Sequence, residues 1–105
     1  MTVRAPFAPK FGANQVLAPA AASATVTIGF GSKSLRLCNT GANVCYVRTC
    51  YSGDPVGTNQ TASTADTPVL AGTVLIISKP QDHDTLATIS ASGTTLLAQP
   101  GEGGF

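Results

Sequence analysis

The densest group of side chains that could do chemistry is the run Asp82-His83-Asp84. An imidazole flanked by two carboxylates could ligate a metal ion, because histidine nitrogen and carboxylate oxygen both bind divalent metals. The run follows Lys79-Pro80, and three polar residues in that position are also typical of a turn exposed to solvent. We interpret the run as such a turn, with no metal and no catalytic role.

Three cysteines, Cys38, Cys45 and Cys50, are the other reactive side chains. With His83 they could form a Cys3His zinc site, but their spacing, C-x6-C-x4-C, lacks the C-x2–4-C pairs that such sites usually use. Cys38 and Cys45 flank a turn and could form a disulfide across a hairpin if oxidised. The odd number and the lack of a recognisable secretory signal favour small buried apolar side chains in a reducing compartment.

Other catalytic and binding chemistries find little support. The chain has five acidic residues, one histidine and no G-x-S-x-G nucleophile elbow. Six basic residues are scattered along it and the net charge is +1, which disfavours a nucleic-acid surface. The longest apolar run, residues 74–77, is far shorter than the roughly 20 residues of a membrane-spanning helix. We therefore expect a protein that is not an enzyme and that binds no cofactor, nucleic acid or membrane.

The composition indicates a protein that needs partners. Only 10% of the 105 residues are charged, against roughly 25% in an average soluble domain, while 43% are hydrophobic. A single small domain with a surface of Thr, Ser and Asn is one interpretation. We prefer a subunit that covers itself in an assembly, a homo-oligomer such as a trimer or dimer.

Short apolar alternations separated by turn residues predict an all-β fold. The chain has 11 glycines and 7 prolines, and no window sustains a helical apolar period. We expect a small antiparallel β-sandwich or jelly-roll-like barrel of about six to eight strands over residues 23–100. The clearest strands are predicted at 24–28, 34–38, 44–49, 73–78, 86–90 and 94–98.

The turn chemistry predicts how some of these strands pair. Residues 34–38 and 44–49 flank the turn cluster 39–43, and residues 86–90 and 94–98 flank 91–93, so each pair is expected to form a hairpin. Residues 73–78 have a continuous apolar centre and are predicted to form a central strand with both faces covered. The polar segment 52–67 is long for a connection and is a candidate contact surface.

Residues 1–22 are predicted to form an extended N-terminal arm. Pro6, Pro9 and Pro19 interrupt the segment and favour polyproline-like conformations over helix or sheet. The arm could pack on its own domain, but we expect it to reach a neighbouring subunit. Its candidate contact residues are four spaced apolar side chains: Phe7, Phe11, Val16 and Leu17. Residues 101–105 are expected to form a flexible C-terminal tail.

Several segments carry a resemblance to a known group of proteins. Residues 35–48, LRLCNTGANVCYVR, resemble the LRLxNTGxNxxYVR segment of small tailed-bacteriophage structural proteins. The resemblance extends through residues 64–74, 84–89, 93–96 and 100–103, although the cysteines at positions 38, 45 and 50 depart from the pattern.

Such proteins are similar to head-decoration, or cement, subunits, which hold capsomers together on the capsid shell. The resemblance implies a virion protein on the capsid surface, assembled in the host cytoplasm, with the major capsid protein as partner. A head–tail connector or a tail structural protein is the first alternative. An alternative of another class is a small Sm-like barrel that binds RNA.

Overall fold

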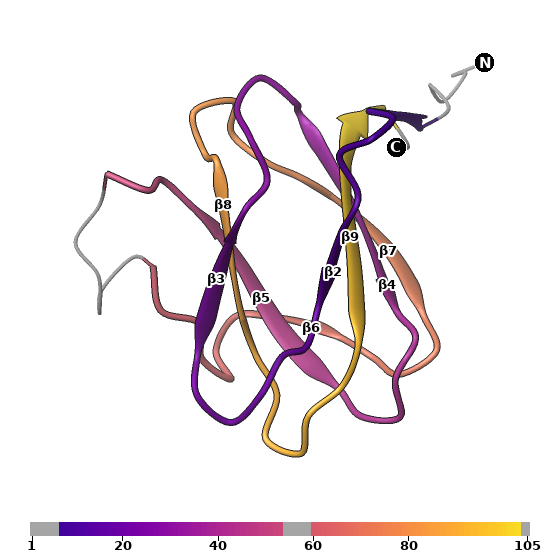
Figure 1. Cartoon of the computed structure of the whole chain (residues 1–105), viewed down its shortest axis with the longest axis vertical. Helices are drawn as coiled ribbons and strands as arrows, with labels where there is room; N and C mark the ends of the chain where they lie inside the picture. The colour runs from indigo at the N-terminus through magenta and orange to yellow at the C-terminus, as the bar shows by residue number, and fades with distance from the viewer. Residues whose placement is uncertain (1–6, 54–59, 104–105) are drawn as a thin grey trace.

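The computed structural model describes residues 7–53 and 60–103. As predicted, the protein is all-β: the described residues contain nine strands and no helix, arranged as two antiparallel sheets (Figure 1). The strand count exceeds the predicted six to eight because two short strands form within the N-terminal arm.

The two sheets pack face to face as a sandwich. Sheet A contains β1 (Ala8–Pro9), β2 (Gln15–Leu17), β4 (Ser34–Asn39), β7 (Val74–Ser78) and β9 (Leu96–Glu102). In sheet A, β9 pairs with β1 and β2 on one side and with β4 on the other, and β7 pairs with β4. Sheet B has the order β3 (Ala24–Thr27), β8 (Thr85–Ile89), β5 (Cys45–Cys50), β6 (Thr67–Val69).

The core lies between the sheets and consists of every second residue of the central strands. Leu35 and Leu37 of β4 face Val47 of β5 and Leu86 of β8 across it, and all four are almost fully buried. Each such side chain contributes roughly 1.5–3 kcal/mol through the apolar surface it removes from water. The intervening residues of the same strands point outward, so alternation in the sequence decides which side chains form each face.

Neither predicted hairpin is present. β4 belongs to sheet A and β5 to sheet B, and the same holds for β9 and β8. Residues 39–43 and 91–93 are thus arches that carry the chain from one sheet to the other. The residues of these turns are compatible with both geometries, because a short polar connection does not specify whether its flanking strands pair or face each other across the core.

Asn39 joins the two arches to the core. Its side chain is 2% exposed; Nδ2 donates to the carbonyl oxygens of Asn43 (2.8 Å) and Val69 (2.9 Å). Its Oδ1 accepts from the Gly41 amide (3.1 Å) and the Thr94 hydroxyl (2.8 Å). Because all these groups are satisfied at once, Asn39 holds the chain reversals at 39–43 and 91–95 and strand β6 in one arrangement.

Strand β7 corrects another prediction. Within residues 7–53 and 60–103 it is an edge strand of sheet A, paired with β4 alone, rather than a central strand (Figure 1). The apolar residues of β7 lie on both faces of the sheet. Leu75 and Ile77 pack against the core, whereas Val74 and Ile76 lie on the outer face of the sheet, and Val74 is 64% exposed.

The described part of the N-terminal arm packs on its own domain. β1 and β2 each pair with β9, and Leu17 packs against the core. Phe7 lies against Gly101, where an added Cβ would come within 2.6 Å of its ring. The C-terminal end also contributes, because β9 runs through Glu102 and includes the first two residues of the predicted tail. Residues 1–6 of the arm lie outside the described residues.

Candidate interaction surface

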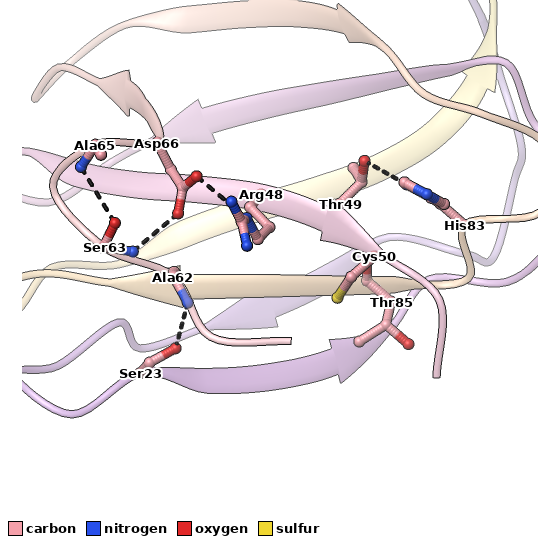
Figure 2. A network of polar contacts seen from close by, with 10 residues as sticks. All are labelled: Ser23, Arg48, Thr49, Cys50, Ala62, Ser63, Ala65, Asp66, His83 and Thr85. Carbon is pink, nitrogen blue, oxygen red and sulfur yellow. Dashed lines mark hydrogen bonds and ion pairs between the residues drawn. The ribbon is translucent and has the colours of Figure 1, made fainter. Parts of the chain in front are cut away.

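The residues of the Asp82-His83-Asp84 run do not converge on one point. Asp82 is exposed, whereas the half-buried His83 ring places Nδ1 3.0 Å from the Thr49 hydroxyl (Figure 2). Asp84 is buried rather than solvated: its carboxylate accepts from the Ser52 amide (2.8 Å) and hydroxyl (2.7 Å). Among the described residues, no three His, Cys, Asp or Glu side chains are grouped as metal ligands are.

The charged side chains of Asp84 and Lys79, at this end of the sandwich, form hydrogen bonds with neighbouring loop residues. Burial alone would raise the pKa of Asp84, but hydrogen bonds from Ser52 and Thr85 outweigh burial and lower it. Lys79 is also buried, which lowers its pKa, and its Nζ donates to the His83 carbonyl oxygen at 2.8 Å. The turn after β7 is thus closed by its own polar groups, an arrangement that stabilises the loop.

The three cysteines are free thiols in three different environments. Cys38 is half-exposed on the outer face of sheet A, whereas Cys45 lies in the core, where burial raises its pKa. Since they belong to different sheets, Cys38 and Cys45 do not face each other across a hairpin as expected. Cys50 packs apart from both, in a second small cluster with Ala62 and Ala87.

That second cluster shows that the chain's own loop covers part of the outer face of sheet B. Ala62 packs over β5 and β8, and its amide donates to the Ser23 hydroxyl at 2.8 Å (Figure 2). Asp66 pairs with Arg48 at 3.1 Å and accepts from the Ser63 amide. The predicted contact loop therefore uses residues 62–66 internally, while residues 54–59 lie outside the described residues.

The outer face of sheet A has a different character. Register places four apolar or weakly polar side chains in one row across four strands, with Val16 beside Leu97, Leu97 beside Cys38 and Cys38 beside Val74. Val16 is 71% and Val74 64% exposed, and the other two are partly exposed. We call this row of Val16, Leu97, Cys38 and Val74 the sheet A stripe.

A second row runs beside the sheet A stripe. It consists of Gln99, Arg36 and Ile76, in register on β9, β4 and β7. Arg36 donates to the Gln99 side chain at 2.9 Å, and its guanidinium lies 5.5 Å from the centre of the Phe7 ring. Gln99 and Phe7 thus hold the charged guanidinium of Arg36 along the sheet, and Ile76 is the apolar residue at the end of the row.

The four predicted arm residues divide into two pairs. Phe7 and Leu17 are used internally, against Arg36 and the core respectively. Phe11, 88% exposed in the turn between β1 and β2, and Val16, in the stripe, are available to a partner. Sequence reasoning missed Leu97, Val74 and Ile76 as surface residues. The signal was present, since apolar residues at consecutive strand positions must face opposite sides.

A cavity of about 200 Å³ adjoins the stripe on the side where β2 and β3 do not pair. Its lining is mainly apolar and comes from both sides of this gap, with Val16, Leu17 and Ala18 from one segment and Ala24, Val26 and Thr88 from strands β3 and β8.

None of the described segments forms a helix long and apolar enough to cross a membrane. No protein-family model and no curated protein matches the chain.

Proposed function

We propose that this protein is a structural subunit of a virus particle, of the head-decoration type, that binds the shell of major capsid protein and stabilises it. The observation that carries the proposal is the contrast between the two outer faces. The centre of sheet B, at β5 and β8, is partly covered by the chain's own loop, whereas sheet A presents the sheet A stripe to solvent. The resemblance of residues 35–48 to phage structural proteins supplies the class of partner.

The physical properties of the stripe suit cementing. Fully burying a Val or Leu side chain contributes roughly 1.5–3 kcal/mol, so four partly exposed residues supply a modest affinity at each site. Copies bound around a symmetric shell multiply modest contacts through multivalency. No acid, base or metal is required for this role, because shape and apolar contact are sufficient.

The first experiment asks where the protein is found. Particles purified from a culture that produces the chain should contain it in amounts comparable to the major capsid protein. A few copies at one vertex would instead favour a head–tail connector, and density on the tail would favour a tail protein. Electron microscopy of the particles separates these locations. Absence from intact particles would contradict all three.

The second experiment tests the surface. Val74→Glu and Val16→Glu place a charge in the stripe and should abolish co-sedimentation with shells that lack the protein. Leu70→Glu is the matched control, because Leu70 is also apolar and exposed (59%) but lies after β6, outside the stripe. Equal binding by all three variants would refute the role of this face. A salt-dependent gel shift with RNA would favour the RNA-binding alternative instead.

Deleting the arm is a poor test of partner binding. Removing residues 1–20 would take away β1 and β2, which pair with β9, and Leu17, which packs on the core. Phe11→Ala is preferable, because this side chain is 88% exposed and its loss should leave folding intact. If Phe11 contacts the shell or a neighbouring subunit, the variant binds shells more weakly than the wild type.

A further inference from the structure

In the part of the chain that the structure describes, one edge of β7 presents a row of backbone groups that no other strand pairs with. The Asn39 amide donates to the Thr73 carbonyl oxygen (3.0 Å) and the Lys79 amide to that of Lys33 (2.9 Å), so residues 73 and 79 bond toward β4. Backbone groups alternate along an antiparallel strand, so the N–H and C=O groups of Val74, Ile76 and Ser78 point away from β4. No strand within residues 7–53 and 60–103 pairs with that side of β7.

This edge also lacks the protection that natural edge strands carry. Exposed edges are usually blocked by a Lys, a Pro, a bulge or a very short strand. Among the other edges, β1 contains Pro9 and β6 contains Pro68, while β2 has three residues and β3 has four. β7 has five residues, V-L-I-I-S, without charge, proline or glycine.

We propose that the partner of this edge is a second copy of the same chain, whose β7 pairs antiparallel with the first about a two-fold axis at Ile76. Ile76 then lies opposite Ile76 of the second copy, and Val74 lies opposite Ser78 in both directions. The outward-pointing groups of these three residues form six backbone hydrogen bonds, and the two copies of sheet A become one continuous sheet. This pairing stands whether or not the protein binds capsids.

The side chains favour a second copy over an unrelated peptide. The pairing places Leu75 opposite Ile77 of the second copy, so the parts of both that the core leaves uncovered bury each other. On the outer face Ile76 contacts Ile76 of the second copy. The row of Gln99, Arg36 and Ile76 in one copy therefore continues into the same row of the other. The strand carries no charge, so like charges do not oppose each other across the axis.

The expected strength of this dimer is modest. Stable specific interfaces bury more than roughly 1,000 Å² in total, and pairing two five-residue edges alone is a smaller contact of the weak, transient kind. We therefore expect dissociation in the micromolar range, with a monomer–dimer equilibrium visible between about 1 and 500 μM. The dimer fraction of such a weakly associating protein rises where copies are held at high local concentration.

The test uses the purified full chain in sedimentation equilibrium. The wild type should shift from monomer to dimer with concentration. Ile76→Lys and Ile76→Pro should both weaken dimerisation by roughly tenfold or more, since the edge then carries a charge or loses a central donor. Both should remain folded by circular dichroism, because the Ile76 amide does not bond to β4. Leu70→Lys is the control that should dimerise like the wild type. A wild type that stays monomeric, or variants that dimerise equally well, would overturn the proposal.

Cross-linking tests the register. In a Cys38→Ser background, Ile76→Cys should form an intermolecular disulfide on mild oxidation, because opposed residues of this type have Cα atoms about 5.5 Å apart, within disulfide range. Val74→Cys is the matched control on the same face and strand. Its counterpart lies four residues along the partner strand, about 13 Å away, which is too far for a bond. Cross-linking of Val74→Cys but not Ile76→Cys, or of neither, would refute the two-fold axis.

Discussion

Replacing Asn39 by Ala removes the side chain that connects both arches to the core. Asn39 is 2% exposed and makes four hydrogen bonds shorter than 3.2 Å, two as donor and two as acceptor. In the variant, the Val69 carbonyl loses this donor in a buried position and the Gly41 amide loses its acceptor. Water can reach the partly buried groups around the arch but not all of them.

The magnitude follows from these bonds. A typical intramolecular hydrogen bond contributes about 0.5–1.5 kcal/mol net, and a buried group left without a partner costs more. Four bonds, of which some are replaced by water, give a loss of about 3 kcal/mol in the free energy of unfolding. For a domain of this size that loss lowers Tm by roughly 12–24 °C.

Urea unfolding monitored by circular dichroism measures the effect. Thr40→Ala is the neighbouring control: this exposed hydroxyl makes one long bond, 3.5 Å, to the Thr95 carbonyl, and its loss should change stability by no more than about 0.5 kcal/mol. A double-mutant cycle with Thr94→Ala should give a coupling energy near 1 kcal/mol. The reasoning fails if Asn39→Ala costs less than about 1 kcal/mol or matches Thr40→Ala.

Asn39→Asp separates hydrogen bonding from side-chain volume. The carboxylate keeps the two accepted bonds but turns a negative oxygen toward the carbonyl oxygens of Asn43 and Val69. At neutral pH this variant should be at least as unstable as Asn39→Ala. Acidification should restore part of the loss, because a protonated carboxyl group can donate to one carbonyl. A stability independent of pH would contradict this account.

Three further predictions concern charge, packing and thiol exposure. Because the pKa of Asp84 is lower in the folded state, its carboxylate stabilises the fold above the unfolded-state pKa near 4, and this contribution is lost as pH falls through the lower folded-state value. Asp84→Asn should therefore flatten the decrease in the free energy of unfolding between about pH 5 and pH 3, measured by urea titrations. An unchanged slope would refute this role of Asp84. Leu17→Ala should cost about 2 kcal/mol by thermal unfolding because Leu17 packs on the core, whereas Val16→Ala, one residue away and exposed, should stay within about 0.5 kcal/mol; equal losses would contradict the placement of β2. In the folded protein a thiol reagent should modify Cys38 rapidly but Cys45 only on unfolding, as counted by mass spectrometry, and rapid labelling of Cys45 would contradict its burial.

Local patterns in the sequence were sufficient to predict six of the nine described strands, but not the short strands β1, β2 and β6. The alternation of Leu35, Arg36 and Leu37 assigns inner and outer faces correctly, and the predicted strand at residues 24–28 differs from β3 by one residue. Consecutive apolar residues such as Val16 and Leu17 indicate that one of the two faces outward, but the surface stripe was not predicted because the sequence does not show which one. Strand register, which brings Val16, Leu97, Cys38 and Val74 into one row, exists only once the strands have paired.

The amino-acid sequence by itself determined the class of fold and the approximate positions of the six longer strands, because side-chain alternation and turn residues act over a few neighbouring positions. Tertiary structure decided which strands pair. The arches at residues 39–43 and 91–93 cross between sheets, and a short turn does not encode that choice; contacts of Asn39 with Val69 and Thr94, 30 and 55 residues away, stabilise it. The same long-range pairing places β7 at an edge, with Ile76 at the centre of its free side.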